Sequence, residues 1–207
     1  MWTVGFDLDM TLVDSRPGIA ATYRRLAELT GVAIDAELAV TRLGPPLEHE
    51  IAHWYPTDEV PAAVARYRAL YPEHAVAPSP ALPGAASALA AVRTSGGRVL
   101  VLTAKKTELA DLHLRHLGLV ADELRGLAWA DGKAQALRET GAIAYVGDHI
   151  ADMAAARSAD VFAVGVTTGP CAADELVEAG ADAVLADLRG FPTLLAQILL
   201  GRRVSGD

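Results

Sequence analysis

The chain has 207 residues, which is enough for one hydrophobic core or for a core domain that carries a smaller insert. Apolar residues make up 52% of it and charged residues 21%, a balance that excludes a disordered polar chain. The formal net charge is −8 and the few basic residues are scattered, so no positive surface for nucleic acid is expected.

Cysteine usage and hydropathy give the expected compartment. Cys171 is the only cysteine, so no intrachain disulfide can form and a reducing cytoplasm is the simplest setting. The first residues lack the basic start and long apolar run of a signal peptide. No window approaches eighteen uncharged apolar residues, so no membrane association is expected.

Short apolar runs alternate with longer helical patterns along most of the chain. We predict buried strands at residues 2–8, 98–102, 143–146 and 161–166, with weaker candidates at 127–129 and 182–185. Helices are predicted between them, at residues 85–94, 107–117, 133–140, 151–158, 173–179 and 192–200. This alternation predicts the α/β class, with right-handed βαβ units and a doubly wound, Rossmann-like parallel sheet.

One stretch, from about residue 17 to residue 83, shows helical pattern without a strand. Apolar residues recur there at a spacing of three to four from Ile19 onward, and further helices are predicted at 36–43, 47–54 and 57–70. The proline-rich segment 72–83 is typical of a linker that returns to the alternating region. We therefore predict an α/β core formed by residues 1–15 and 84–207, and an inserted α-helical cap domain formed by residues 16–83.

The strongest local signal is a pair of aspartates, Asp7 and Asp9, at the end of the first predicted strand. Ligands bind at the carboxyl ends of strands in open α/β sheets, and buried carboxylates need a cationic partner. A metal ion there would keep Asp7 ionised and able to attack an electrophile. The alternative is a solvated loop in which the aspartates cap a helix.

A second acidic cluster follows the strand at residues 143–146. Asp148 and Asp152 are four residues apart and so face the same side of a helix start. Carboxylates from two strand ends would form an oxygen-rich site that suits the hard cation Mg²⁺. The alternative is that both residues only cap the helix N-terminus.

Four motifs in order resemble those of the haloacid dehalogenase-like hydrolase superfamily, in its phosphoglycolate-phosphatase-like branch with a helical cap. They are Asp7-x-Asp9-x-Thr11, the segment 100–105 with Thr103, Lys133, and Gly147-Asp148-x-x-x-Asp152. They span nearly the whole chain. Two departures stand out: no proline follows Lys133, and Met10 replaces a glycine that is common in the family.

The resemblance implies a phosphatase that acts on a small phosphorylated metabolite. Asp7 would attack phosphorus and form an aspartyl-phosphate, and Asp9 would act as general acid and base. Mg²⁺ would be bound by Asp7, Asp148 and the backbone carbonyl of Asp9, with Asp152 in support. Thr103 and Lys133 would bind the phosphoryl group, although Lys105 and Lys106 remain alternatives for the active-site cation.

The predicted cap offers two candidate substrate contacts, Arg42 and His49. Arg42 and the turn at residues 44–46 resemble the cap loop that faces the catalytic site in the family. His49 begins the pattern His49-Glu50-x-x-His53, which also matches the zinc-peptidase signature H-E-x-x-H. We treat zinc proteolysis as a remote alternative, because Pro56 leaves room for only a short helix and no third ligand stands in a known motif.

Other functions on the same framework stay open. A hydrolytic haloacid dehalogenase would share the aspartate nucleophile, but it would not need Asp9 or a full metal cluster. A sugar phosphomutase would pass the phosphoryl group to a sugar instead of water, and a non-catalytic binding module would not need the acidic residues. The sequence leaves the physiological ester open, and it is consistent with either a monomer or a homodimer.

Overall fold

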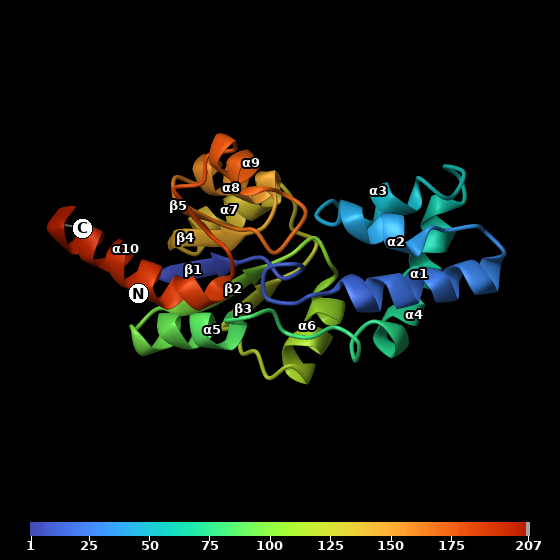
Figure 1. Ribbon diagram of the computed structural model, residues 1–207, viewed down its shortest axis with the longest axis horizontal. Helices are drawn as coiled ribbons and strands as arrows, with labels where there is room; N and C mark the ends of the chain where they lie inside the picture. Colours follow the sequence, from blue (N-terminus) through green and yellow to red (C-terminus); the bar gives the residue numbers. More distant parts are fainter. Residues whose placement is uncertain (206–207) are drawn as a thin grey trace.

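The structure is a computed structural model that describes residues 1–205 (Figure 1). Six strands form one sheet in the order β3–β2–β1–β4–β5–β6, and every neighbouring pair is parallel. The strands are β1 (Thr3–Phe6), β2 (Arg98–Leu102), β3 (Glu123–Arg125), β4 (Ala142–Gly147), β5 (Phe162–Val166) and β6 (Ala183–Leu185). The predicted α/β class and doubly wound parallel sheet are confirmed.

Helices cover both faces of the sheet, because side chains alternate between the two faces along each strand (Figure 1). On β2, Val99 and Val101 pack in one cluster, and Leu100 and Leu102 pack in the other. The first cluster lies under α5 (Ala85–Thr94), α6 (Thr107–His116) and α10 (Phe191–Ser205), and the second under α7 (Asp131–Glu139), α8 (Ile150–Ser158) and α9 (Ala173–Glu178). No helix within residues 1–205 has both the length and the apolar character to cross a membrane.

The remaining helices lie beyond the carboxyl ends of the strands and have a hydrophobic cluster of their own (Figure 1). We call them the helical bundle: α1 (Arg16–Thr30), α2 (Ala36–Ala39), α3 (Leu47–Ile51) and α4 (Val60–His74), with a 3₁₀ turn at Val40–Arg42. Buried apolar faces of α1 and α4 pack together through Tyr23, Leu26 and Tyr67. A short 3₁₀ turn at Leu188–Gly190 precedes α10 in the core.

The two segments that connect the sheet to the helical bundle lie side by side. The backbone N–H of Asp14 donates to the carbonyl of Pro80 at 2.9 Å, and that of Leu82 donates to the carbonyl of Leu12 at 2.9 Å. These hydrogen bonds tie the outgoing and returning chain together at one point. The four helices of the bundle therefore lie between β1 and α5 in the chain.

Two predictions from sequence are wrong. Residues 127–129 are not a strand; the edge strand is β3 at Glu123–Arg125, and Leu127 has φ +55°, which no extended strand allows. The apolar pattern missed β3 because an edge strand tolerates charged residues such as Glu123 and Arg125. The linker also begins later than residue 72, because α4 continues through Pro72 to His74. Burial of Tyr71 and Ala75 on either side offsets the cost of about 3 kcal/mol of an interior proline.

The close contact between the start of α1 and the end of α4 yields a stability prediction. A Cβ atom on Gly18 would lie 2.0 Å from the carbonyl oxygen of Ala75 and 2.5 Å from Oγ of Ser79. We expect Gly18→Ala to lower the free energy of unfolding by about 2 kcal/mol, since backbone must move. Gly132 in α7 has no atom within 4 Å of the same position, so Gly132→Ala should raise stability by up to about 1 kcal/mol. Urea unfolding of both variants measures the difference, and equal effects would contradict the packing argument.

Candidate active site

The site lies where the strand order reverses. The chain leaves β1 toward β2 and β3 on one side and toward β4, β5 and β6 on the other, so a crevice opens beyond the carboxyl ends of β1 and β4. Asp7 directly follows β1, and its N–H donates to the carbonyl of Val146 in β4 at 2.8 Å. Asp148 directly follows β4. The topology thus places two acidic side chains at one crevice.

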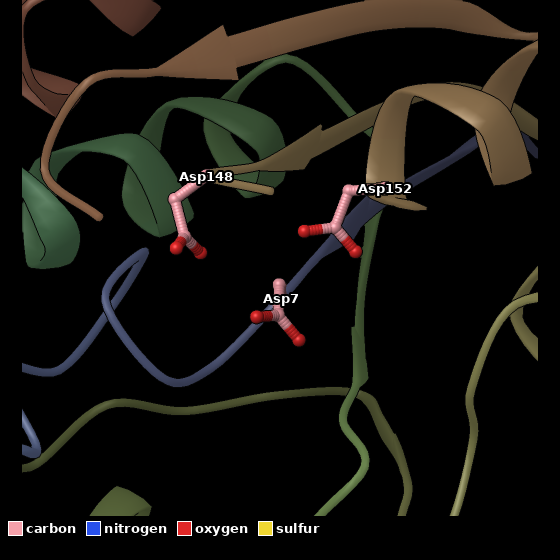
Figure 2. Close-up of side chains that lie close together, drawn as sticks. All are labelled: Asp7, Asp148 and Asp152. Atoms are coloured by element: carbon pink, nitrogen blue, oxygen red, sulfur yellow. The ribbon is translucent and has the colours of Figure 1, made fainter. Parts of the chain in front are cut away.

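Asp152 completes a cluster of three carboxylates. It lies in the first turn of α8, and its side chain accepts a hydrogen bond from the N–H of His149 at 3.2 Å. Asp7, Asp148 and Asp152 are buried, and each offers a carboxylate oxygen within 4.8 Å of the others. Figure 2 shows the three side chains close together, with Asp7 after β1, Asp148 after β4 and Asp152 at the start of α8. Both acidic motifs predicted from sequence meet here.

Lys133 joins two of these acids. Its Nζ donates to Oδ1 of Asp7 at 2.8 Å and to Oδ1 of Asp152 at 2.7 Å, and only 3% of its side chain is exposed. Burial alone would lower the pKa of Lys133, but the negative charges of Asp152 and Asp7 raise it well above its usual value. Lys133 is therefore a permanent cation at the cluster, although no proline follows it.

The remaining negative charge makes the cluster suitable for a divalent cation. Burial raises the pKa of Asp7 to about 7, against the opposing effect of Lys133, and burial beside Asp7 and Asp152 raises the pKa of Asp148. Lys133 can neutralise only one of the three carboxylates. The two others match a dication, and three carboxylate donors suit a hard metal such as Mg²⁺.

Two glycines make room for the cluster, and only one of them, Gly147, stands in a motif predicted from sequence. A Cβ on Gly147 would lie 2.4 Å from Oδ2 of Asp152, and one on Gly169, in the loop after β5, would lie 1.8 Å from Oδ2 of Asp148. Thr11 fixes the other side of Asp148, because its hydroxyl donates to Oδ1 at 2.9 Å. The Gly147 position is visible in the motif, whereas Gly169 stands in no predicted motif.

Asp9 does not join the carboxylate cluster; its partner is Lys105, which sequence reasoning left only as an alternative cation. Nζ of Lys105 donates to Oδ1 of Asp9 at 2.5 Å and lies 4.9 Å from the ring centre of Tyr71. Burial opposes ionisation of Asp9, but the charge of Lys105 prevails and holds the pKa of Asp9 below its usual value. The signal that could have identified Lys105 is its position, two residues beyond Thr103 in a chain with three lysines.

Met10 and Thr103 lie in the segments that follow β1 and β2, close to Asp9 and Lys105 in the sequence. Met10 has φ +59°, a conformation that favours glycine, and the hydroxyl of Thr168 donates to its carbonyl at 2.5 Å. Met10 therefore forms a strained turn that the neighbouring loop holds in place. Thr103 is buried directly after β2; its hydroxyl oxygen accepts the N–H of Lys105 at 3.2 Å and keeps its proton free to donate.

A cavity of about 90 Å³ lies between the sheet edge and the helical bundle. Its walls on the core side include Asp7, Asp9 and Thr103, and on the bundle side they include Arg42 and residues 43–45. His49 is exposed and is not among the lining residues. This volume is below the usual 300–1,000 Å³ of drug-sized ligand pockets, so the cavity suits a small ligand.

The H-E-x-x-H pattern does not form a metal site. α3 ends at Ile51, so His53 lies beyond the helix, and Glu50 is held by Arg42 and Trp54. Within residues 1–205, Asp7, Asp148 and Asp152 are the only group of three or more potential ligands close enough to share an ion. The structure gives zinc proteolysis no support.

Comparison with known proteins identifies the family. The model of the haloacid dehalogenase-like hydrolase family matches residues 4–157, which include every motif named above. The chain belongs to this family. The resemblance inferred from the motifs is therefore confirmed, and the carboxylate cluster of this family member lies within the matched region.

Individual relatives of this family member differ in their described activities. It is 32% identical to the tyrosine-protein kinase PtkA of Mycobacterium tuberculosis over 77% of this chain, but it spans only 60% of that relative's length. It is 30% identical to a phosphoglycolate phosphatase of Cupriavidus necator, with 91% of this chain and 90% of the relative covered. A haloacid dehalogenase-like hydrolase from Streptococcus pneumoniae has the same fold, with a TM-score of 0.80, 24% identity, and coverage of 96% and 98%.

A buried histidine behind Tyr71 makes stability depend on pH. The ring of His113 in α6 is buried, and its Nε2 shares a hydrogen bond of 2.9 Å with the hydroxyl of Tyr71. Burial, aided by the charge of Lys105, lowers the pKa of His113 to about 4. The unfolded chain, with a histidine pKa near 6.5, therefore binds the proton more readily than the native protein does.

Because the pKa of His113 falls on folding, its contribution is favourable above pH 6.5 and is lost as the pH falls toward 4. Between pH 6.5 and pH 4, preferential protonation of His113 in the unfolded chain should lower the free energy of unfolding by up to about 3 kcal/mol. Urea unfolding between pH 7 and pH 4.5 should show a shallower decline for His113→Phe than for the wild type. The matched variant His116→Phe, at an exposed position, should keep the wild-type slope; identical slopes for all three proteins would contradict the assignment.

Proposed function

We propose that this protein is a magnesium-dependent phosphatase that hydrolyses a small phosphate monoester through a covalent intermediate on Asp7. The observation that carries the proposal is the position of Asp7: it contacts the cation Lys133, lies beside the carboxylates of Asp148 and Asp152, and lines the cavity. Membership of a hydrolase family and relatives described as phosphatases support the same reaction.

The acidic cluster fits a magnesium ion. Asp7 and Asp148 would hold it together with the backbone carbonyl of Asp9, and Asp152 would support it while keeping Lys133 in place. When bound, the ion would neutralise negative charge on the phosphoryl oxygens and so make the phosphorus open to attack by an anion. The buried carboxylates would then all remain ionised.

Four side chains take separate roles in the proposed reaction. A carboxylate oxygen of Asp7 attacks phosphorus as the bond to the alcohol oxygen breaks, and water later attacks the resulting aspartyl-phosphate and releases inorganic phosphate. Asp9 gives a proton to the leaving alcohol and takes one from the attacking water. Lys133 and the hydroxyl of Thr103 contact the phosphoryl oxygens.

The ion pair with Lys105 bears directly on Asp9. In the absence of substrate, Lys105 keeps Asp9 in the base form, which is the form needed for the water step. For the first step Asp9 must gain a proton, and a phosphate monoester with a second pKa near 6 is one source. Lys105 is thus a positioning residue for Asp9 in this proposal.

The helical bundle would act as a cap that selects the substrate. We propose that residues 16–83 form this cap domain on a core of residues 1–15 and 84–207, joined by the paired connections at Asp14 and Leu82. Closure over the cavity would exclude water from the phosphoryl site until the alcohol has left. Arg42, which lines the cavity, stays a candidate substrate contact, whereas exposed His49 is a weak one.

The other activities are less well supported. A dehalogenase would not need the full cluster of Asp7, Asp148 and Asp152. A sugar phosphomutase or a kinase would transfer the phosphoryl group to an acceptor other than water, and the relatives described as kinases extend well beyond this chain. Release of inorganic phosphate without an added acceptor distinguishes the phosphatase from both.

The nucleophile assignment predicts complete dependence on Asp7. We expect Asp7→Asn to reduce phosphate release from a panel of metabolite esters to background, because an amide is not a nucleophile and binds Mg²⁺ poorly. A chelator should do the same to the wild type, and Mg²⁺ should restore its activity. Asp14→Asn, in the same loop but paired with Arg16, should stay active. Full activity of Asp7→Asn would exclude this mechanism.

The assignment of Asp9 predicts a loss of turnover with the metal site intact. We expect Asp9→Asn to lower kcat by about 10²–10⁴-fold, because asparagine keeps the shape but cannot exchange the proton. Calorimetric titration with Mg²⁺ should give an affinity close to that of the wild type, since the side chain of Asp9 lies outside the cluster. Unchanged kcat would remove Asp9 from acid–base catalysis, and lost Mg²⁺ binding would reassign it to the metal site.

A further inference from the structure

The bundle end of the cavity is lined by three tyrosines that use their hydroxyls differently. Tyr23 from α1 and Tyr67 and Tyr71 from α4 stack in sequence, with ring centres 4.7 Å and 5.8 Å apart. The hydroxyl of Tyr71 is bound to His113. Those of Tyr23 and Tyr67 have no hydrogen-bond partner among residues 1–205, yet neither is fully enclosed by protein atoms. Two hydroxyls at the cavity wall are thus available to a ligand.

Arg42, a cation on the same wall, already has an ion-pair partner. Arg42 donates to both carboxylate oxygens of Glu50, at 2.9 Å and 2.7 Å, and Glu50 also accepts from Nε1 of Trp54 at 2.9 Å. The guanidinium of Arg42 lies 5.7 Å from the ring centre of Trp54, which helps to hold it in place. A bidentate pair of this kind is among the stronger hydrogen-bonded arrangements in proteins.

Two other cations that line the cavity, Arg68 and Lys105, are also paired, and Lys106 is the only cavity-lining cation without an ion pair among residues 1–205. Arg68 donates to Glu48 at 2.8 Å, and Lys105 is paired with Asp9. Lys106 lines the cavity but is exposed, so water screens its charge. An anionic group on the leaving alcohol would have to displace Glu50 from Arg42, which is costly, or depend on the solvent-screened charge of Lys106 while Glu50 stays in the same cavity wall.

We infer that the alcohol released by this enzyme is small and neutral, and that its hydroxyl or amide groups are bound by Tyr23 and Tyr67. This deepens the proposed phosphatase function and depends on it. Phosphoglycolate, the ester named for some relatives, would leave an anionic alcohol because glycolate carries a carboxylate. Tyr23 and Tyr67 would therefore set the specificity of this chain apart from those relatives.

The test compares esters that differ in one group. We propose to measure kcat/KM with Mg²⁺ for 2-phosphoglycolate, for its amide 2-phosphoglycolamide, and for 2-hydroxyethyl phosphate, in which an alcohol replaces the carboxylate. Wild-type enzyme should favour both neutral esters by at least tenfold. Binding of the same three compounds to Asp9→Asn, which should keep Mg²⁺ binding and turn over slowly, is measured by calorimetry and provides a second readout.

Single substitutions test which residues cause the preference for neutral esters. Tyr23→Phe and Tyr67→Phe should each lower kcat/KM for the neutral esters by about fivefold, mainly through KM, because each removes one hydrogen bond to the alcohol. Glu50→Gln should free Arg42 and raise kcat/KM for 2-phosphoglycolate. Tyr55→Phe is the matched control, since the hydroxyl of Tyr55 pairs with Thr30 and the residue does not line the cavity. Its values should equal those of the wild type.

The outcomes separate the two proposals. Hydrolysis with a preference for 2-phosphoglycolate would overturn the inference of a neutral alcohol and leave the phosphatase function standing. Equal values for wild type, Tyr23→Phe and Tyr67→Phe would overturn the role of the tyrosines. If no ester is hydrolysed or bound, the proposed function and the inference both fail.

Discussion

The structure depends on holding three carboxylates together out of water at the ends of β1 and β4. Asp7, Asp148 and Asp152 repel one another, and burial raises the pKa of Asp7 and of Asp148. Lys133 relieves part of this repulsion by bonding to two of them, and Thr11 binds the third. The constraint extends to the backbone, since Gly147 and Gly169 leave no room for a side chain beside the acids. An arrangement so unfavourable without a cation is better explained by binding than by stability.

The same edge of the sheet also carries the connections to the helical bundle. The loop that follows Asp7 contains the strained Met10, runs through Leu12 and Asp14, and pairs there with the returning chain at residues 80–82. Any movement of the bundle therefore acts on the loop that carries Asp9. Lys105 adds a second link, because it contacts Asp9 of the core and the ring of Tyr71 of the bundle. The position of the bundle and the environment of Asp9 are physically coupled.

Much of this architecture could be predicted from the sequence because buried parallel strands have a strong apolar signal. β2 and α5 were predicted to the residue, and the order of the motifs was enough to gather Asp7, Asp148 and Lys133 at one crevice. Local patterns failed where long-range contacts decide the structure. β3 is an edge strand with charged residues, and α4 continues through Pro72 because Tyr71 and Ala75 are buried. The pair between Lys105 and Asp9 and the space required at Gly169 arise from segments far apart in the chain, which no spacing rule connects.

The core and the bundle differ in how their charges are arranged, and this difference bears on specificity. At the carboxyl ends of the strands the acids outnumber their cationic partners, which suits a cation and is the basis of the proposed phosphoryl site. On the bundle wall Arg42 and Arg68 each have a carboxylate partner, and the hydroxyls of Tyr23 and Tyr67 do not have a partner within residues 1–205. A ligand that spans both surfaces must therefore be strongly charged at one end and neutral but hydrogen-bonding at the other. Shared chemistry in the core can thus coexist with a substrate preference that belongs to the bundle alone.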